Sequence, residues 1–196
     1  LAGEIKSNAQ IEIETAVRRA IGEIGYTDAT TAFNADSVVI TNLLGRQAAE
    51  IDQGVFGAKE PGAGYQGLMF VFATDETPEL MPLPILLAHR LSAGLADDRK
   101  RKAVSWLRPD GKTQVTVRYQ SGEPVEVTAV VVSTQHAFGV AHETIEAYVR
   151  EELLPKRLGS WHNLDARVMV NPAGSFATGG PSADCGVTGR KIIVDT

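Results

Sequence analysis

The sequence predicts an α+β fold, in which helices pack on one face of mixed β-sheets. Three observations support this prediction. Three stretches carry apolar residues at helical spacing, short β-branched runs lie between them, and two of these runs are joined by a hairpin-type turn. Few runs follow a strict strand–helix–strand order, so an all-parallel sheet is not expected. Hydrophobic residues make up 43% of the 196 residues and charged residues 22%, which is enough apolar side chain to bury a core.

The first expected element is an amphipathic helix over about residues 14–24, followed by Gly25 as a C-terminal stop. Its apolar stripe consists of Ile13, Val17, Ala20, Ile21 and Ile24. Residues 37–44 (SVVITNLL) and 68–73 (LMFVFA) predict two buried strands because they are short, apolar and nearly continuous. Residues 45–67 between them are glycine-rich and aperiodic, which is typical of lids or binding segments.

A second helix is expected from about Pro84 to Lys102, because proline fits the first turn of a helix. Residues 113–119 and 125–134 then predict two strands, joined by a turn at Gln120-Ser121-Gly122-Glu123. Polar and apolar residues alternate in the first of these strands, so one of its faces should be exposed to water.

A third helix is expected over about residues 142–154, with Pro155 as the residue that ends it. Short strands are expected at 168–170 and 191–194, on either side of a glycine-rich loop. No internal repeat is evident.

Composition excludes several classes of protein. The net charge of −5 and the pI of about 5.4 argue against binding to nucleic acid through bulk charge. No apolar run approaches the ~20 residues that span a bilayer, so no membrane association is expected. Cys185 is the single cysteine, which fits a reducing, cytoplasmic location. Both ends of the chain look interrupted, and we therefore expect a piece of a longer protein.

Four polar, glycine-rich segments could carry chemistry: residues 62–67, 107–112, 174–181 and 184–191. The first is expected to be a tight turn rather than a ligand-binding loop, and Pro109-Asp110-Gly111 in the second is an ordinary turn sequence. For the last two, an anion-binding site and a plain loop are equally good hypotheses. His89 and His136 lie near apolar runs, and no histidine pair has metal-ligand spacing, so structural roles are expected.

Taken in order, long blocks of this sequence resemble S-adenosylmethionine synthetase, and the resemblance covers nearly the whole chain. The blocks are GEI at 3–5, IGYTD at 24–28, DQGV at 52–55, GAGYQGLMF at 62–70, ATDETPELMPLP at 73–84, AHRL at 88–91, WLRPDGKTQVTV at 106–117, VVVSTQH at 130–136, NP at 171–172, GGP at 179–181 and DCGVTGRKIIVDT at 184–196.

The resemblance implies a fold of three similar α+β domains around a pseudo-threefold axis. Residues 1–55 would be the end of the N-terminal domain, 56–178 the middle domain and 179–196 the start of the C-terminal domain. It also implies that S-adenosylmethionine is formed from ATP and L-methionine, with release of phosphate and diphosphate. Mg²⁺ and K⁺ would be the cofactors, and a homodimer or homotetramer would have its active sites between subunits.

Site residues follow from the resemblance, position by position. The positions that match ATP-binding residues are Asp110, Gly111, Lys112, Ser175, Phe176, Asp184, Arg190 and Lys191. Those that match methionine-binding residues are Glu4, Gln47 and Asp184. Lys112, Arg190 and Lys191 match the cations around the triphosphate, which makes them the expected catalytic residues. The metal ligands stay unassigned.

Three departures from the family pattern bear on activity. Tyr65 stands where the family has aspartate, and Ser175 stands where it usually has arginine. Ala48-Ala49-Glu50 replaces the usual Ser-Pro-Asp. Each of the first two changes removes a charge from the site. An active synthetase and a catalytically inactive paralogue, acting as a regulatory or assembly subunit, are therefore both kept as hypotheses.

Overall fold

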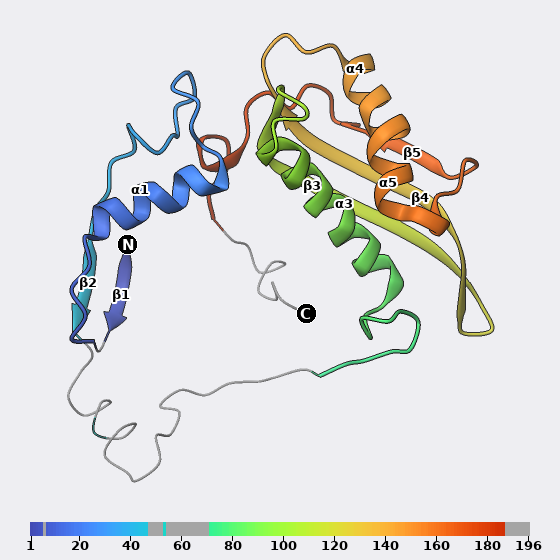
Figure 1. Ribbon diagram of the computed structural model, residues 1–196, viewed down its shortest axis with the longest axis horizontal. Coiled ribbons are helices and arrows are strands. Elements are labelled where there is room, and N and C mark those ends of the chain that lie inside the picture. Colours follow the sequence, from blue (N-terminus) through green and yellow to red (C-terminus); the bar gives the residue numbers. More distant parts are fainter. Residues whose placement is uncertain (6, 47–52, 54–70, 187–196) are drawn as a thin grey trace. The chain divides into compact units, whose positions relative to one another are not determined.

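The computed structural model describes residues 1–5, 7–46, 53 and 71–186, which form two compact units. The first unit is built mainly from Leu1–Glu23 and Thr27–Val71, and the second from Ile24–Tyr26 and Phe72–Asp195. Helices and strands occur in both units, and the helices of the second unit lie on one face of a mixed sheet (Figure 1). The predicted α+β class is confirmed.

The first unit contains two short parallel strands and one helix. Strand β1 (Ala2–Ile5) pairs with β2 (Leu43–Arg46), and α1 (Ile13–Ile24) confirms the first predicted helix. Arg18 on α1 donates from its guanidinium to the carbonyl oxygens of Ala35 and Asp36, at 2.7 and 2.9 Å. These two hydrogen bonds hold the helix against the segment that follows it.

The strand predicted over residues 37–44 is wrong for most of its length. Only its last two residues belong to β2, and the side chain of Val39 is 88% exposed. The four residues of β1 pair in register from Ala2–Leu43 to Ile5–Arg46, so residues 37–42 have no strand partner in the part of the chain that the structure describes. A β-branched run needs such a partner to become a strand.

The second unit is a three-stranded sheet in the order β3-β4-β5. Strand β3 (Leu107–Gln120) is antiparallel to β4 (Glu123–His136), and β4 is parallel to β5 (Arg167–Val170). The predicted hairpin is confirmed, with strands longer than expected. Its two-residue turn has positive φ at Ser121 (54°) and Gly122 (88°), the geometry that matches the twist of paired strands.

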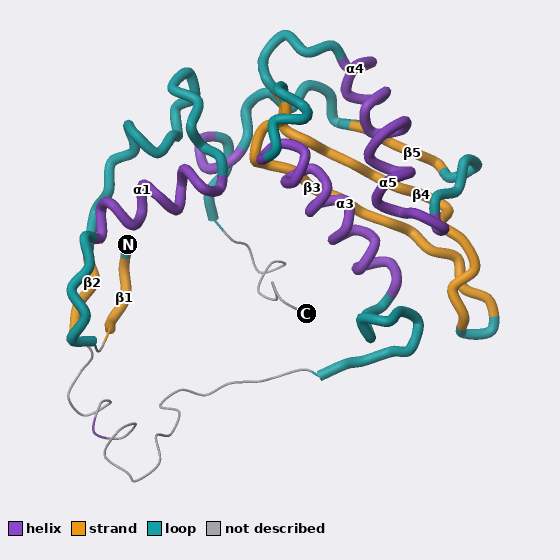
Figure 2. The backbone as a smooth tube through the Cα atoms, viewed as in Figure 1, coloured by secondary structure: helices purple, strands orange, loops and turns teal. Residues whose placement is uncertain are grey.

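Two helical segments cover one face of this sheet (Figures 1 and 2). The first is α3 (Leu83–Lys100), which confirms the second predicted helix. The second runs from α4 (His142–Ala147) through a π-helical turn (Tyr148–Leu153) into α5 (Leu154–Leu158). It connects β4 to the parallel strand β5, as a parallel pair requires. No helix among the described residues has the length and hydropathy needed to cross a membrane.

Pro155 does not end the third helix as predicted, because the helix continues to Leu158. The π-helical turn directly before it changes the hydrogen-bonding pattern. Pro155 is the second residue of α5, directly after this turn, where the wider hydrogen-bonding pattern accommodates a residue that has no N–H to donate.

The core lies between the sheet and its helices. Its fully buried members include Leu83, Leu87, Leu91, Val130, Val132, Val149, Leu153 and Leu158. Val71 and Phe72 are not part of it, since 96% and 73% of their surfaces are exposed and residues 71–73 form no strand. The strand predicted at 68–73 is therefore wrong for these three residues, and its first three lie outside the described residues. The strand predicted at 168–170 is confirmed. The strand predicted at 191–194 lies outside the described residues.

Gly94 brings α3 into close contact with the second helical segment. A Cβ atom at this position would lie 2.7 Å from Arg157 Nε and 2.9 Å from Leu153 Cδ1. Gly22 on α1 offers a contrast, because a Cβ there would lie 3.8 Å from Ala35 Cβ, an ordinary contact.

We therefore expect opposite effects from one substitution in the two helices. Gly22→Ala should stabilise its unit by up to about 1 kcal/mol through helix propensity. Gly94→Ala should destabilise its unit by about 1–2 kcal/mol, because steric overlap outweighs the same gain in propensity. Urea unfolding followed by circular dichroism measures both changes. A Gly94→Ala protein as stable as wild type would contradict the close helix contact.

Asp98 is a buried carboxylate at the end of α3. Its Oδ2 accepts a 2.8 Å hydrogen bond from the buried Tyr148 hydroxyl, and its Oδ1 lies 3.0 Å from Arg101 and 3.5 Å from Lys156. Burial by itself raises the pKa of Asp98, but the Tyr148 hydroxyl, Lys156 and Arg157 outweigh burial and hold this pKa below its usual range.

A carboxyl whose pKa is depressed by folding stabilises the protein above its unfolded pKa of about 4, and this contribution is lost as the pH falls through the lower folded value. Asp98→Asn should cost about 2 kcal/mol at pH 7, and its difference from wild type should shrink below about pH 4. Asp97→Asn is the matched control, since Asp97 is half exposed and should cost less than about 1 kcal/mol. Thermal unfolding between pH 2 and 7 tests this, and a difference that does not vary with pH would disprove it.

Candidate functional site

The structure describes most, but not all, of the predicted site residues. Asp110, Gly111 and Lys112 lie in β3, Ser175 and Phe176 lie in the loop after β5, and Asp184 follows a short 3-10 turn at Gly180–Ser182. Glu4 lies in β1 of the first unit, where it is exposed. Gln47, Tyr65, Arg190 and Lys191 lie outside the described residues.

The Pro109-Asp110-Gly111 sequence forms a bulge inside β3, and the turn predicted there is wrong. Leu107 is opposite His136 and Gly111 is opposite Thr134, so three residues of β3 face the single residue Gln135 of β4. Proline has no N–H to give to a strand partner and is tolerated at such irregularities. The bulge releases Asp110 from regular pairing, so that its side chain is free for another partner.

Asp110 connects β3 to the glycine-rich loop after β5. Its Oδ2 accepts a hydrogen bond of 2.8 Å from the backbone N–H of Gly180. Its own N–H donates to Gln135 Oε1 at 3.3 Å. A Cβ atom on Gly179 would lie 3.1 Å from Asp110 Oδ2 and 2.8 Å from Phe176 Cε2, so only glycine fits between these groups.

Phe176 is held at the end of β4. The His136 N–H donates to the Phe176 carbonyl oxygen at 3.2 Å, and the Phe176 N–H donates to His136 Nε2 at 3.0 Å. Next along the loop, the carbonyl oxygen of Ala177 accepts from Gln135 Nε2 at 3.2 Å. The loop thus brings Phe176, half-buried, and Asp110 into one neighbourhood although they are far apart in sequence.

Tyr26 also reaches this neighbourhood, within the second unit. A Cβ atom on Gly180, whose φ is +65°, would overlap the Tyr26 hydroxyl and lie 2.8 Å from the Tyr26 ring. Burial raises the pKa of Tyr26, the negative charge of Asp110 raises it further, and Arg99 opposes both. The sequence alone assigns no role to Tyr26 or Gln135, although each lies in a block that resembles the family, IGYTD or VVVSTQH.

Lys112 and Asp184 are two of the exposed members of the candidate site. Lys112 is opposite Ser133 in the hairpin. Its neighbour Thr113 donates to the Ala88 carbonyl of α3, so alternation along the strand places Lys112 on the face without helices. The N–H of Asp184 donates to the Gly180 carbonyl at 3.1 Å, which ties this residue to the same loop.

The described residues around Asp110 enclose little space. A pocket of about 100 Å³ lies between α3 and the bulge, and its lining includes Arg99, Arg108 and Asp110. This volume is below the few hundred Å³ of a typical small-molecule site.

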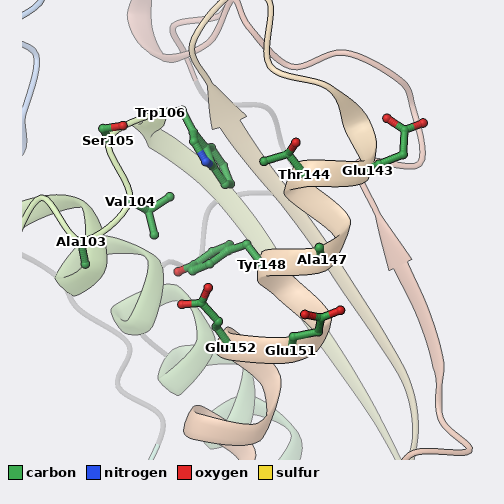
Figure 3. A pocket seen from close by; sticks show the side chains of 10 residues that line it. All are labelled: Ala103, Val104, Ser105, Trp106, Glu143, Thr144, Ala147, Tyr148, Glu151 and Glu152. Atoms are coloured by element: carbon green, nitrogen blue, oxygen red, sulfur yellow. The ribbon is translucent and has the colours of Figure 1, made fainter.

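A larger pocket of about 620 Å³ lies elsewhere, between the start of β3 and the α4 segment (Figure 3). The Trp106 and Tyr148 rings meet edge to face on its wall, with centroids 5.5 Å apart. Glu143, Glu151 and Glu152 also line it. No predicted site residue is among its lining residues, so it is separate from the candidate site.

Metal binding by protein ligands alone finds no support in residues 1–5, 7–46, 53 and 71–186. No group of three or more His, Cys, Asp and Glu side chains within them could hold a metal ion. Mg²⁺ commonly uses one or two carboxylates together with substrate phosphates and water, so the carboxylates present are compatible with an ion that enters with a polyphosphate.

Comparison with known proteins gives consistent matches. The family model for the central domain of S-adenosylmethionine synthetase matches residues 60–176. An S-adenosylmethionine synthase of Sorangium cellulosum (strain So ce56) is 50% identical over 204 residues, covering 100% of this chain and 48% of the relative. An S-adenosylmethionine synthase of Helicobacter hepaticus (strain ATCC 51449 / 3B1) is 48% identical over 198 residues, covering 100% of this chain and 51% of the relative. The chain therefore spans about half the length of the curated relatives it matches.

The packing around Gly179 gives a test of the site's geometry. Gly179→Ala should push apart Phe176 and Gln135, at a cost of about 1–3 kcal/mol in unfolding free energy. It should also accelerate amide hydrogen exchange at residues 176–180, as measured by mass spectrometry. Gly22→Ala, which has room for its methyl group, should leave exchange in this loop unchanged. Equal exchange in Gly179→Ala and wild type would contradict the described packing.

Proposed function

The chain belongs to the S-adenosylmethionine synthetase family, and we propose that it provides part of a methionine adenosyltransferase. The activity forms S-adenosylmethionine from ATP and L-methionine and releases phosphate and diphosphate. One observation carries the proposal for this chain: Asp110 on β3 and Gly180 in the loop after β5 are joined by a 2.8 Å hydrogen bond. That bond unites two segments whose sequences both match ATP-binding positions of the family.

The proposed reaction requires little proton transfer by protein side chains. The methionine sulfur forms a bond to C5′ of the ribose, the C5′–O bond breaks, and its electron pair leaves with tripolyphosphate. The sulfur becomes a sulfonium, and water later cleaves the tripolyphosphate into phosphate and diphosphate. A thioether sulfur is already a nucleophile, so the protein has to align it with C5′ and stabilise the leaving group.

The expected residue roles follow from these two tasks. Lys112, Arg190 and Lys191 would neutralise the triphosphate, and Phe176 would pack against the adenosine. Asp110 and Gly111 would contact the nucleotide from the bulge of β3, with Ser175 beside them. Asp184 would be shared between ATP and methionine, and Glu4 and Gln47 would hold methionine.

The activity is expected to depend on metal ions, with Mg²⁺ and K⁺ as the specific cofactors. Mg²⁺ bound to phosphate oxygens would supply additional positive charge at the leaving group. No protein ligand is assigned to either ion.

We place the domain boundaries at residues 55 and 178, so that 1–55 ends one synthetase domain, 56–178 is the middle domain and 179–196 begins the next. The family match over 60–176 supports the middle range. A homodimer or homotetramer in the cytoplasm is the expected state, with active sites between subunits. The small volume enclosed around Asp110 supports a site that other chain segments complete.

The assay that tests the function measures S-adenosylmethionine and phosphate formation by the full-length protein, supplied with ATP, L-methionine, Mg²⁺ and K⁺. Turnover by wild type is the expected result, with Tyr65 as a tolerated change. A Tyr65→Asp variant is assayed beside it. Activity only in this variant, or in neither protein, would overturn the proposal and favour an inactive subunit.

Lys112 gives a sharper test of mechanism. Lys112→Met should lower kcat about 10²- to 10³-fold, because a cation near the leaving triphosphate is lost. Lys100→Met, at the exposed end of α3, is the matched control and should retain wild-type turnover. Steady-state kinetics at saturating ATP and methionine distinguishes the two. A kcat in Lys112→Met within threefold of the control would remove Lys112 from the catalytic residues.

A further inference from the structure

We infer that Gln135 and His136, here called the β4 clamp, are positioning residues that set where the Phe176 ring meets the adenosine of ATP. This inference rests on the proposed function and adds two residues to it. The β4 clamp consists of consecutive residues at the end of one strand, so their side chains leave opposite faces of that strand. Both nevertheless bind backbone atoms of the loop at residues 176–177.

The hydrogen bonds of His136 define its tautomer. The backbone N–H of Phe176 can only donate, so His136 Nε2 must be the acceptor of their 3.0 Å hydrogen bond. The ring proton is therefore on Nδ1, which donates to the Ala137 carbonyl oxygen at 2.9 Å. With its own N–H bound to the Phe176 carbonyl, His136 holds Phe176 through both its backbone and its side chain.

Gln135 holds the same loop from the other side of the strand. Its Nε2 donates to the Ala177 carbonyl oxygen, and its Oε1 accepts from the Asp110 N–H. One amide thus connects the loop to the bulge of β3. Both residues of the β4 clamp are 4% exposed, and burying such polar groups is costly unless they are hydrogen-bonded. All of these partners are backbone atoms, so the geometry of the loop is what the β4 clamp determines.

Neither Gln135 nor His136 is expected to stabilise the charge that develops on the leaving triphosphate. Their effect should fall on the position of Phe176, and hence on the affinity for the adenosine part of ATP. A ring held in place before binding does not lose conformational freedom when the nucleotide arrives. A ring on a loop that is not held loses conformational freedom when the nucleotide binds. Weakening the β4 clamp should therefore reduce the affinity for ATP more than the affinity for tripolyphosphate, which has no adenosine.

Two conservative substitutions separate the roles of the ring nitrogens. His136→Gln can place an acceptor near the Nε2 position and keep the bond to the Phe176 N–H. His136→Asn reaches only as far as Nδ1 and loses that bond. In the full-length protein, His136→Asn should raise the Kd for ATP about tenfold and leave the Kd for tripolyphosphate within twofold. His136→Gln should remain within about threefold of wild type for both ligands.

Two further variants complete the experiment. Gln135→Met removes both side-chain bonds of Gln135 and should show the same division between ATP and tripolyphosphate, which keeps the test available if His136→Asn does not fold. Asn163→Ala is the matched control, since it removes one side-chain bond to the β4 backbone, at Val127, away from the loop. It should change neither Kd.

Each outcome decides the question. Wild-type affinity for ATP in His136→Asn and Gln135→Met overturns the inference and leaves the proposed function standing. Equal loss of ATP and tripolyphosphate overturns it in favour of a general structural role. A wild-type protein that binds no ATP overturns the proposed function instead. In that case amide hydrogen exchange at Phe176 still tests the β4 clamp. Exchange should be about tenfold faster in His136→Asn than in His136→Gln, and equal exchange rates would disprove the inference.

Discussion

The bulge in β3 is the constraint on which the rest of the candidate site depends. Pro109 cannot donate a hydrogen bond to β4, so the pairing of the two strands is interrupted where it stands. Three residues then lie opposite Gln135, which leaves the Asp110 carboxylate free to accept from Gly180. Without that interruption, Asp110 would lie in a regular ladder, and the loop after β5 would lose its connection to β3.

The end of β4 fixes the irregular loop that follows β5. Thr134, Gln135 and His136 are all buried, and each binds the segment after β5. The side chain of Asn171 accepts from the Thr134 N–H at 2.8 Å and donates to the Thr134 carbonyl at 3.2 Å, as a strand neighbour would. Side chains therefore continue the hydrogen bonding of the sheet after β5 has ended, and the loop is fixed without being regular.

The sequence predicted well those elements whose pattern arises locally. The helices beginning near Ile13 and Leu83 have an apolar periodicity, and the hairpin at Ser121-Gly122 has turn residues that suit positive φ. Predictions failed where a distant partner decides the outcome. Val39 and Val71 are apolar but have no sheet partner in the described part of the chain. Asp110 is the middle residue of a typical turn sequence, yet the pairing of the flanking residues with β4 makes this sequence part of a strand. The sequence assigned no role to Gln135, because its hydrogen-bond partners lie 25 and 42 residues away.

The π-helical turn in the connection from β4 to β5 affects how the length of this chain can change during evolution. A π-helical turn holds one residue more than an α-helical turn, so losing one residue from Tyr148–Leu153 would return it to an α-helical turn and keep the residues after it in register. Losing one residue from the regular helix on either side would instead rotate the side chains after it by about 100°. Leu158, now buried, would then turn away from the core. A deletion should therefore be accepted in the π-helical turn sooner than in α4 or α5, although none of these segments contains a residue of the candidate site.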